Sequence, residues 1–161
     1  VLLQLEMMQR LPNEHLVLAG SGKKKFEQSV KDTIERLSLH NVTVVGRIFT
    51  EQKAALLSRC KALVFPSLSE GFGLPVAEAM CFGKPSFITR LTSLPEIGGD
   101  INYYFTSLDA KQMAKDVEQG LADFATNPDS KAQALKQRAA TFSWDNSADG
   151  YIQYYLDLLK K

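Results

Sequence analysis

Short apolar runs alternate with longer segments of helical periodicity along this chain. We expect the apolar runs to form strands over residues 15–19, 42–45, 62–65, 86–89 and 103–105. The other segments predict helices over residues 1–11, 23–37, 50–60, 74–82, 109–126, 128–142 and 144–159. Strands that alternate with helices pair in parallel through right-handed crossovers. The alternation therefore predicts an α/β fold with a Rossmann-like, doubly wound parallel sheet.

The composition fits one folded domain and excludes several classes of protein. The 161 residues are 45% hydrophobic and 23% charged, with a formal net charge of +1. This balance argues against a nucleic-acid partner or an anionic membrane surface. No apolar run has the length of a transmembrane segment, and no signal peptide is visible. We expect a single cytoplasmic domain over residues 1–161, with a helical tail over residues 109–161.

Local patterns assign a few residues to caps and to the core. Thr50 is expected to be the N-cap of the helix over residues 50–60, because a threonine hydroxyl accepts a backbone N–H there. Cys60 and Cys81 each lie in a helical pattern. We expect both to be small core residues in a reducing compartment, not a disulfide or metal site. Val1 is not a methionine, which suggests a fragment of a longer protein.

The most informative stretch covers residues 66–85, with the sequence PSLSEGFGLPVAEAMCFGKP. A predicted strand leads into it, and Gly71 and Gly73 lie in the loop that follows. Pro75 suits the first turn of the next helix, where its missing N–H costs nothing. Gly83 then ends that helix. The stretch predicts a strand, a glycine loop and a helix that begins at the carboxyl end of the strand.

Two acidic residues surround this corner, Glu70 in the loop and Glu78 in the helix. The N-terminus of a helix binds anions through its free N–H groups, and glycines let the backbone approach a ligand closely. Carboxylates accept hydrogen bonds from hydroxyl groups. A ligand that carries both phosphate and hydroxyls, such as a nucleotide sugar, fits this pattern. The alternative is a capped helix with two scattered acids, which leaves the paired glycines unexplained.

A second glycine turn, GSGK at residues 20–23, does not fit the known phosphate-binding motifs. A Walker motif requires a glycine five positions before Gly22, where this chain has Val17. The dinucleotide fingerprint requires a third glycine where Lys25 stands. We expect a tight turn between a strand and a helix, and a supporting phosphate role for its amides stays open.

The remaining polar residues give weaker signals. The chain has no Asp-x-Asp pair, no serine nucleophile elbow and no Cys/His pair, so we expect neither a metal ion nor another cofactor. Arg47 follows a strand end, where a phosphate or base contact and a solvated loop are equally open. The segment SLPE at residues 93–96 predicts a turn before a short helix, or a ligand contact at the same edge of the sheet.

Residues 70–80, EGFGLPVAEAM, resemble the E-x7-E signature of glycosyltransferase family four, whose members are retaining enzymes of the GT-B type. The resemblance covers nearly the whole chain and corresponds to the carboxyl-terminal, donor-binding half of such an enzyme. Flanking segments agree with it: Pro66-Ser67, Gly83-Lys84-Pro85, Leu94-Pro95-Glu96 and Phe142-Ser143-Trp144.

The resemblance implies a role for each site residue. Glu78 would hydrogen-bond the ribose hydroxyls of the donor, and Glu70, the catalytic residue, would face the transferred sugar. The sugar hydroxyls and the diphosphate would bind at the backbone of Gly71, Phe72, Gly73, Leu74 and Val76. The base would be flanked by Gly46, Arg47 and Ile48. Fixed N–H dipoles stabilise a leaving diphosphate without a metal ion.

The resemblance also implies parts that this chain lacks. The donor half of the family begins with a strand at the sheet centre and a loop whose Arg and Lys grip the diphosphate. Residues 1–10 match only the end of the helix that follows, so we expect the sheet to lack its first strand. The acceptor-binding amino-terminal half is also missing. We therefore expect the 161 residues alone to be inactive.

The implied activity is transfer of a hexose from a nucleoside diphosphate sugar to a hydroxyl of a glycan or lipid-linked acceptor, with retention of configuration. The full-length protein is expected in the cytoplasm, with peripheral contact at the inner membrane face left open. Two alternatives remain: a non-catalytic Rossmann-like nucleotide-binding or interaction module, and a nucleotide-sugar epimerase of GT-B type. An epimerase would not be expected to carry the Glu-Gly-Phe-Gly loop. The sequence does not identify the base, the sugar, the acceptor or the oligomeric state.

Overall fold

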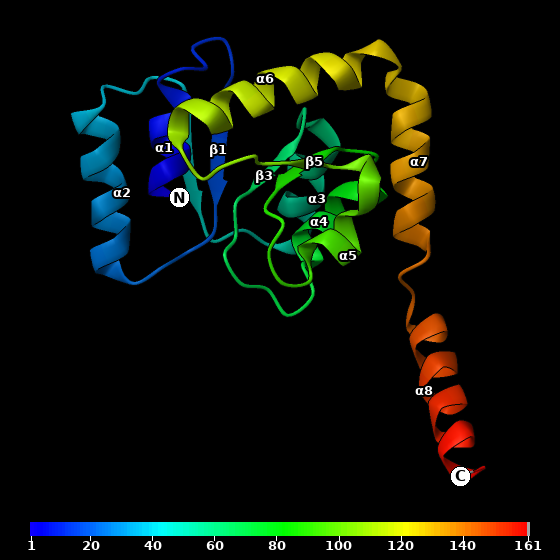
Figure 1. Cartoon of the computed structure of the whole chain (residues 1–161). Helices are drawn as coiled ribbons and strands as arrows, with labels where there is room; N and C mark the ends of the chain where they lie inside the picture. Colours follow the sequence, from blue (N-terminus) through cyan, green and yellow to red (C-terminus); the bar gives the residue numbers. More distant parts are fainter. Residues whose placement is uncertain (161) are drawn as a thin grey trace.

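A computed structural model describes residues 1–160 of the chain (Figure 1). The strands are β1 (Leu16–Ala19), β2 (Val42–Gly46), β3 (Leu63–Phe65), β4 (Ser86–Ile88) and β5 (Tyr103–Tyr104). The helices are α1 (Leu2–Met8), α2 (Lys24–Arg36), α3 (Thr50–Arg59), α4 (Leu74–Cys81), α5 (Leu94–Gly98), α6 (Ala110–Thr126), α7 (Pro128–Ala140) and α8 (Trp144–Leu159), with a 3-10 turn at Gly99–Ile101. Every predicted strand and helix is present close to its expected bounds.

All strand pairs are parallel, as predicted, but the strands form two sheets. β1 pairs with β2, whereas β3, β4 and β5 form a second sheet in that order. The division falls at the centre of the expected sheet, where the resemblance places the missing strand. β1 and β3 therefore each have an edge with no paired strand among the described residues. At the open edge of β3, Gln4 of α1 donates from Nε2 to the carbonyl of Val64 at 2.9 Å.

Two clusters of buried apolar side chains form the core. The first joins α1, α2 and α6 to the strands and includes Leu5, Met7, Phe87 and Met113. Phe87 stacks on Tyr103 with ring centroids 5.1 Å apart. The second packs α4 and α5 against α7 and consists of Val76, Met80, Ile88, Leu94, Ile97, Leu135 and Ala139. This second cluster supports the corner that carries the candidate site.

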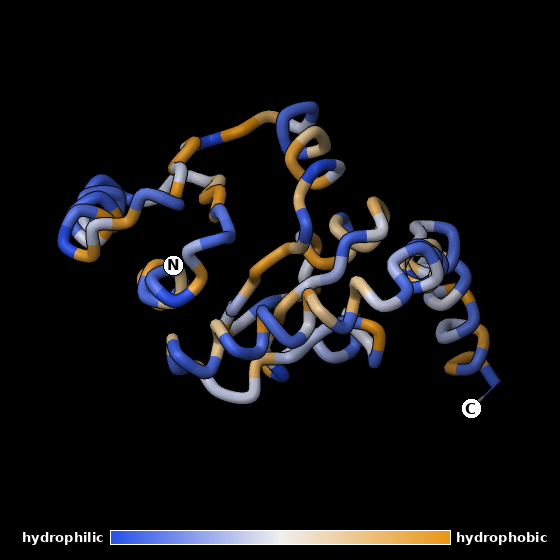
Figure 2. Tube along the Cα trace, turned by 90° about the horizontal axis from the view of Figure 1, so that it is seen from above, coloured by the Kyte–Doolittle hydropathy of each residue, from blue (hydrophilic) through white to orange (hydrophobic). Residues whose placement is uncertain are grey.

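The outer helices contribute little to the core. α2, at the left of Figure 2, is mostly hydrophilic and buries only Val30 and Thr33. α8 extends away from the rest of the chain in Figure 1 and buries none of its residues. Trp144, at the start of α8, is 90% exposed. Across residues 1–160, every helix is too short or too polar to cross a membrane.

Two predictions about single residues are wrong. Phe49, not Thr50, is the N-cap of α3, and the Gln52 side chain accepts the Phe49 N–H at 2.9 Å. Both cysteines are free, but Cys81 is exposed and Cys60 is only half-buried. Cys60 directly follows α3. Cys81 is the last residue of α4 and is not one of the residues that this helix buries. Helical periodicity predicts a buried face poorly at the end of a helix, because the packing there depends on the neighbouring elements.

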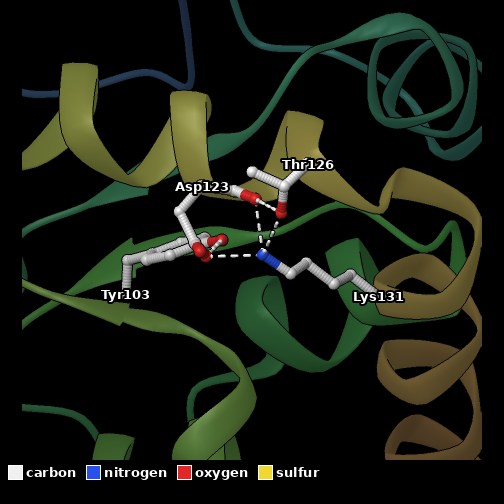
Figure 3. Close-up of polar contacts among 4 residues, drawn as sticks. All are labelled: Tyr103, Asp123, Thr126 and Lys131. Carbon is white, nitrogen blue, oxygen red and sulfur yellow. Dashed lines mark hydrogen bonds and ion pairs between the residues drawn. The ribbon is translucent and has the colours of Figure 1, made fainter.

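A polar network joins α6 and α7 to the edge strand β5 (Figure 3). The Tyr103 hydroxyl donates to Asp123 Oδ2 at 2.7 Å, and the Lys131 ammonium lies 2.7 Å from the same oxygen. Lys131, followed by Tyr103, lowers the pKa of the Asp123 carboxyl. Burial, followed by the hydrogen bond to Asp123, raises the pKa of Tyr103. The network therefore favours the ionised carboxylate and the protonated phenol.

We expect Asp123→Asn to lower the free energy of unfolding at pH 7 and to have a smaller effect in acid. A carboxyl with a depressed pKa stabilises the fold above its unfolded-state pKa of about 4, and this stabilisation is lost as the pH falls through the lower folded-state value. Urea unfolding at pH 7 and about pH 3 measures the difference. Asp149→Asn, on exposed α8, is the matched control. Equal destabilisation at both pH values would contradict the expected role of the charge.

Candidate functional site

The loop of residues 66–73 carries the chain from β3 into α4. Gly73 precedes α4 with φ of 104°, a left-handed conformation that glycine adopts without a steric penalty. A Cβ at Gly73 would also lie 2.9 Å from Cδ2 of Leu94. Pro75 occupies the first turn of α4, as predicted. The turn into α4 therefore requires glycine at position 73 both for its backbone and for its packing on α5.

Unused backbone donors gather where α4 begins. Within residues 1–160, the amides of Gly71, Phe72, Gly73 and Leu74 donate no hydrogen bond to the chain. The Val76 amide is already bonded to the carbonyl of Gly73 at 2.9 Å. The predicted amide donors are therefore free, apart from that of Val76. Free amides at a helix N-terminus carry partial positive charge and bind anions.

Glu70 is half-buried and held in place by its neighbours. Its Oε1 accepts a hydrogen bond from Ser67 Oγ at 2.7 Å. Its backbone N–H donates to Thr92 Oγ1 at 3.0 Å, and its carbonyl accepts from Ser93 Oγ at 3.1 Å. The second carboxylate oxygen, Oε2, has no partner among the described residues. Glu70 therefore presents one acceptor oxygen to a ligand from a fixed backbone.

Glu78 lies on α4 and forms an ion pair with α3. Nζ of Lys53 is 2.5 Å from Glu78 Oε1, and both side chains are partly exposed. Oε2 of Glu78 is unpaired within the described part of the chain. Sequence reasoning missed Lys53, because it lies among polar residues of an amphipathic helix and no local pattern points from α3 to α4. The pair places a cation beside one of the two carboxylates of the corner.

The loop predicted to flank the base makes no direct polar contact with the loop of Glu70 among the described residues. Gly46 ends β2 with φ of 68°, and its carbonyl accepts the Gly20 N–H at 2.7 Å. Arg47 is exposed and Ile48 is half-buried. No hydrogen bond or ion pair of residues 1–160 joins this loop to the loop of Glu70. The two loops are linked only indirectly: α3 follows the loop of Gly46, and its Lys53 pairs with Glu78 on α4, the helix that follows the loop of Glu70.

The second glycine turn of the sequence is not part of the site. The turn at residues 20–23 leads from β1 towards α2, and the Gly22 N–H donates to Glu27 Oε1 at 3.1 Å. The carboxylate of Glu27 thus occupies an amide that a bound phosphate would need.

Within residues 1–160, no three His, Cys, Asp or Glu side chains are grouped so that they could hold a metal ion.

Sequence reasoning placed residues 93–96 at this edge of the sheet, but it missed that hydroxyl groups after β4 bond to the loop of Glu70. Thr89 Oγ1 donates to the carbonyl of Ser67 at 2.6 Å, and Ser93 Oγ lies 2.9 Å from the carbonyl of Phe72. The available signal was only positional: β3 and β4 are neighbours, so the loops at their carboxyl ends meet at one edge of the sheet. Glu96, from the same segment, has an exposed side chain.

A family model described as "Glycosyl transferases group 1" matches residues 1–141. The chain belongs to this family. Among curated relatives of this group 1 domain, the serotype-specific mannosyltransferase WbdA of Escherichia coli is 36% identical over 161 residues, which are 99% of this chain and 19% of the relative. The O-antigen chain mannosyltransferase B of Escherichia coli is 33% identical over 156 residues, 96% of this chain and 39% of the relative. The group 1 domain thus spans less than half the length of these relatives.

Solved structures confirm the predicted Rossmann-like fold of a GT-B carboxyl-terminal half. Sucrose-phosphate synthase from Thermosynechococcus elongatus superposes with a TM-score of 0.83 and 26% identity, over 99% of this chain and 42% of that one. Anabaena HepE, in complex with UDP and glucose, gives a TM-score of 0.78 and 20% identity, over 96% of this chain and 44% of that one. The family inferred from the E-x7-E signature and the fold class inferred from the alternation of strands and helices are therefore both confirmed.

Proposed function

We propose that this group 1 domain is the donor-binding half of a retaining glycosyltransferase that uses a nucleoside diphosphate sugar. The observation that carries this proposal is the set of free amides at the start of α4, between the carboxylates of Glu70 and Glu78. A nucleotide sugar has a diphosphate between two groups rich in hydroxyls, the ribose and the sugar. The corner offers matching groups in the same order: the Glu70 carboxylate for the sugar hydroxyls, the free amides for the diphosphate, and the Glu78 carboxylate for the ribose hydroxyls.

In this proposal Glu78 accepts hydrogen bonds from the ribose, and Glu70 faces the sugar. The bond between the anomeric carbon and the diphosphate oxygen breaks, and its electron pair passes to the diphosphate. The acceptor oxygen bonds to the same face of that carbon, and the acceptor proton leaves with the diphosphate. Amide dipoles that are fixed before the reaction stabilise the growing negative charge. The proposal assigns this task to the backbone, requires no metal ion or cofactor, and keeps Gly46, Arg47 and Ile48 as the loop beside the base.

The relatives guide the choice of sugar and acceptor. Two of them are named as mannosyltransferases, so mannose is the first sugar to test. Both are much longer than this chain, and we place the site for a glycan or lipid-linked acceptor in a domain outside the 161 residues. The isolated chain is then expected to bind donor weakly without sugar transfer. Transfer catalysed by the 161 residues alone would overturn this part of the proposal.

A thermal-shift series with UDP, GDP and ADP, each free and as its mannose conjugate, tests donor binding directly. We expect one base to raise the melting temperature more than the other two. At a concentration of about 100 Kd, a ligand adds about 2.7 kcal/mol to the stability of the folded state. For a chain of this size that corresponds to roughly 5–10 °C. The matching nucleoside without phosphate is the control, and absence of any shift with all six compounds would contradict the proposal.

A further inference from the structure

Thr92 has a backbone conformation that is rare for its residue type. Its φ of 50° lies in the left-handed region, which β-branched residues seldom adopt. Such conformations persist only where the surrounding structure imposes them, and they concentrate at functional sites. In this conformation Thr92 Oγ1 accepts the backbone N–H of Glu70 at 3.0 Å. The unusual backbone of Thr92 thus coincides with a direct contact to the candidate catalytic residue.

The neighbouring hydroxyls hold the other parts of the same loop. Ser93 Oγ lies 3.1 Å from the carbonyl of Glu70 and 2.9 Å from that of Phe72. Ser93 precedes α5 as its N-cap residue, yet its side chain makes no capping hydrogen bond to the helix. Its hydroxyl is used for the loop of Glu70 instead. Together, Thr92 and Ser93 contact both the N–H and the carbonyl of Glu70.

The segment that carries these hydroxyls is held in place by the helix that follows it, α5. Leu94 and Ile97 of α5 are 0% and 4% exposed. At the end of α5, Asn102 Nδ2 donates to the carbonyl of Gly98 and Arg138 Nε to that of Ile97, each at 2.8 Å. α5 is therefore anchored to both β4 and α7 by packing and hydrogen bonds. Thr92 and Ser93 directly precede this anchored helix, so they can restrain the more exposed loop of Glu70.

We propose that Thr92 and Ser93 are positioning residues that hold Glu70 and the free amides of residues 71–74 in the arrangement used for sugar transfer. The inference rests on the proposed function, in which Glu70 faces the transferred sugar. Each hydroxyl acts on the backbone of the loop and not on the substrate. Its loss therefore affects the rate of transfer more than the affinity for nucleotide, because the exact placement of the amides matters most when the leaving diphosphate gains charge, and Glu78 binds the ribose from α4, outside the restrained loop.

Hydrogen exchange on the 161-residue chain measures the restraint itself. In Thr92→Val, which removes the acceptor at nearly unchanged shape, we expect the Glu70 amide to exchange about tenfold faster, as for loss of one hydrogen bond. Thr92→Ser retains an Oγ and should restore slow exchange. Ser107→Ala, in another exposed loop, is the matched control for Ser93→Ala. Unchanged exchange at the Glu70 amide in both Thr92→Val and Ser93→Ala would overturn the proposal, as would an equal acceleration throughout the chain.

Kinetics on the complete transferase measure how the reaction uses this restraint. We expect Thr92→Val and Ser93→Ala each to lower kcat by about fivefold to tenfold, with KM for the donor within about twofold. Thr92→Ser should recover most of kcat. A lower affinity at unchanged kcat would overturn the positioning role. Faster exchange at Glu70 in an enzyme whose activity is unaffected by Glu70→Gln would support the restraint and reject the proposed function, so the two failures are distinguishable.

Discussion

Replacing Glu70 with glutamine is expected to lower kcat of the complete transferase by about 10²–10³-fold, the range found when a preorganised polar group is removed from a reacting centre. Glutamine keeps the shape and can still accept the hydrogen bond from Ser67, which Glu70 receives at 2.7 Å. The loop should therefore keep its conformation, while the charge beside the sugar is lost. Because we propose that the ribose is bound by Glu78 on α4 and not by Glu70, the affinity for nucleoside diphosphate should change by no more than about twofold.

Steady-state transfer assays and nucleotide titrations of the same preparation separate these two effects. Glu96→Gln is the matched control: it removes another exposed carboxylate from the neighbouring segment, and the Glu96 side chain makes no hydrogen bond among the described residues. The control should retain kcat. If Glu70→Gln also retains full kcat, the carboxylate has no part in transfer, and a non-catalytic nucleotide-binding role becomes the better interpretation of the corner.

Local patterns were sufficient to predict the elements that build the site. β4 was found because its residues Ser86, Phe87 and Ile88 are all fully buried, and a strand covered on both faces is continuously apolar or small. The turn at Gly73 was found because only glycine readily adopts its left-handed backbone. In both cases a residue's own conformation or burial constrains its type, so the signal lies in adjacent residues.

Contacts between distant segments were not predictable in this way. Thr92 and Ser93 bond to a loop about twenty residues earlier, and short polar residues after a strand fit an ordinary turn equally well. Lys53 on α3 pairs with Glu78 on α4, although a lysine on an amphipathic helix usually indicates only a solvated face. The sequence led us to expect a sheet without its first strand, but not that β1 and β3 would lie in two separate sheets. Each case depends on tertiary packing that no local pattern contains.

Glu78→Gln is expected to weaken binding of the preferred nucleoside diphosphate by about 10–100-fold. A hydrogen bond to a charged group contributes about 1.5–3 kcal/mol, and a tenfold change in affinity corresponds to about 1.4 kcal/mol. Glutamine retains one acceptor oxygen but loses the charge and the second acceptor for the two ribose hydroxyls. The fold should tolerate the change, because the ion pair with Lys53 is partly exposed and such pairs contribute little to stability.

Titration with a nucleotide that lacks both ribose hydroxyls distinguishes ribose binding from a general electrostatic effect. The wild-type chain should bind the 2′,3′-dideoxy nucleotide about as weakly as Glu78→Gln binds the natural one, and the variant should no longer discriminate between the two. Lys53→Met is the matched control, because it breaks the same ion pair and leaves the carboxylate in place; discrimination should persist in it. If Lys53→Met loses discrimination as completely as Glu78→Gln, the ion pair recognises the ribose as a unit, and the assignment to Glu78 alone is wrong.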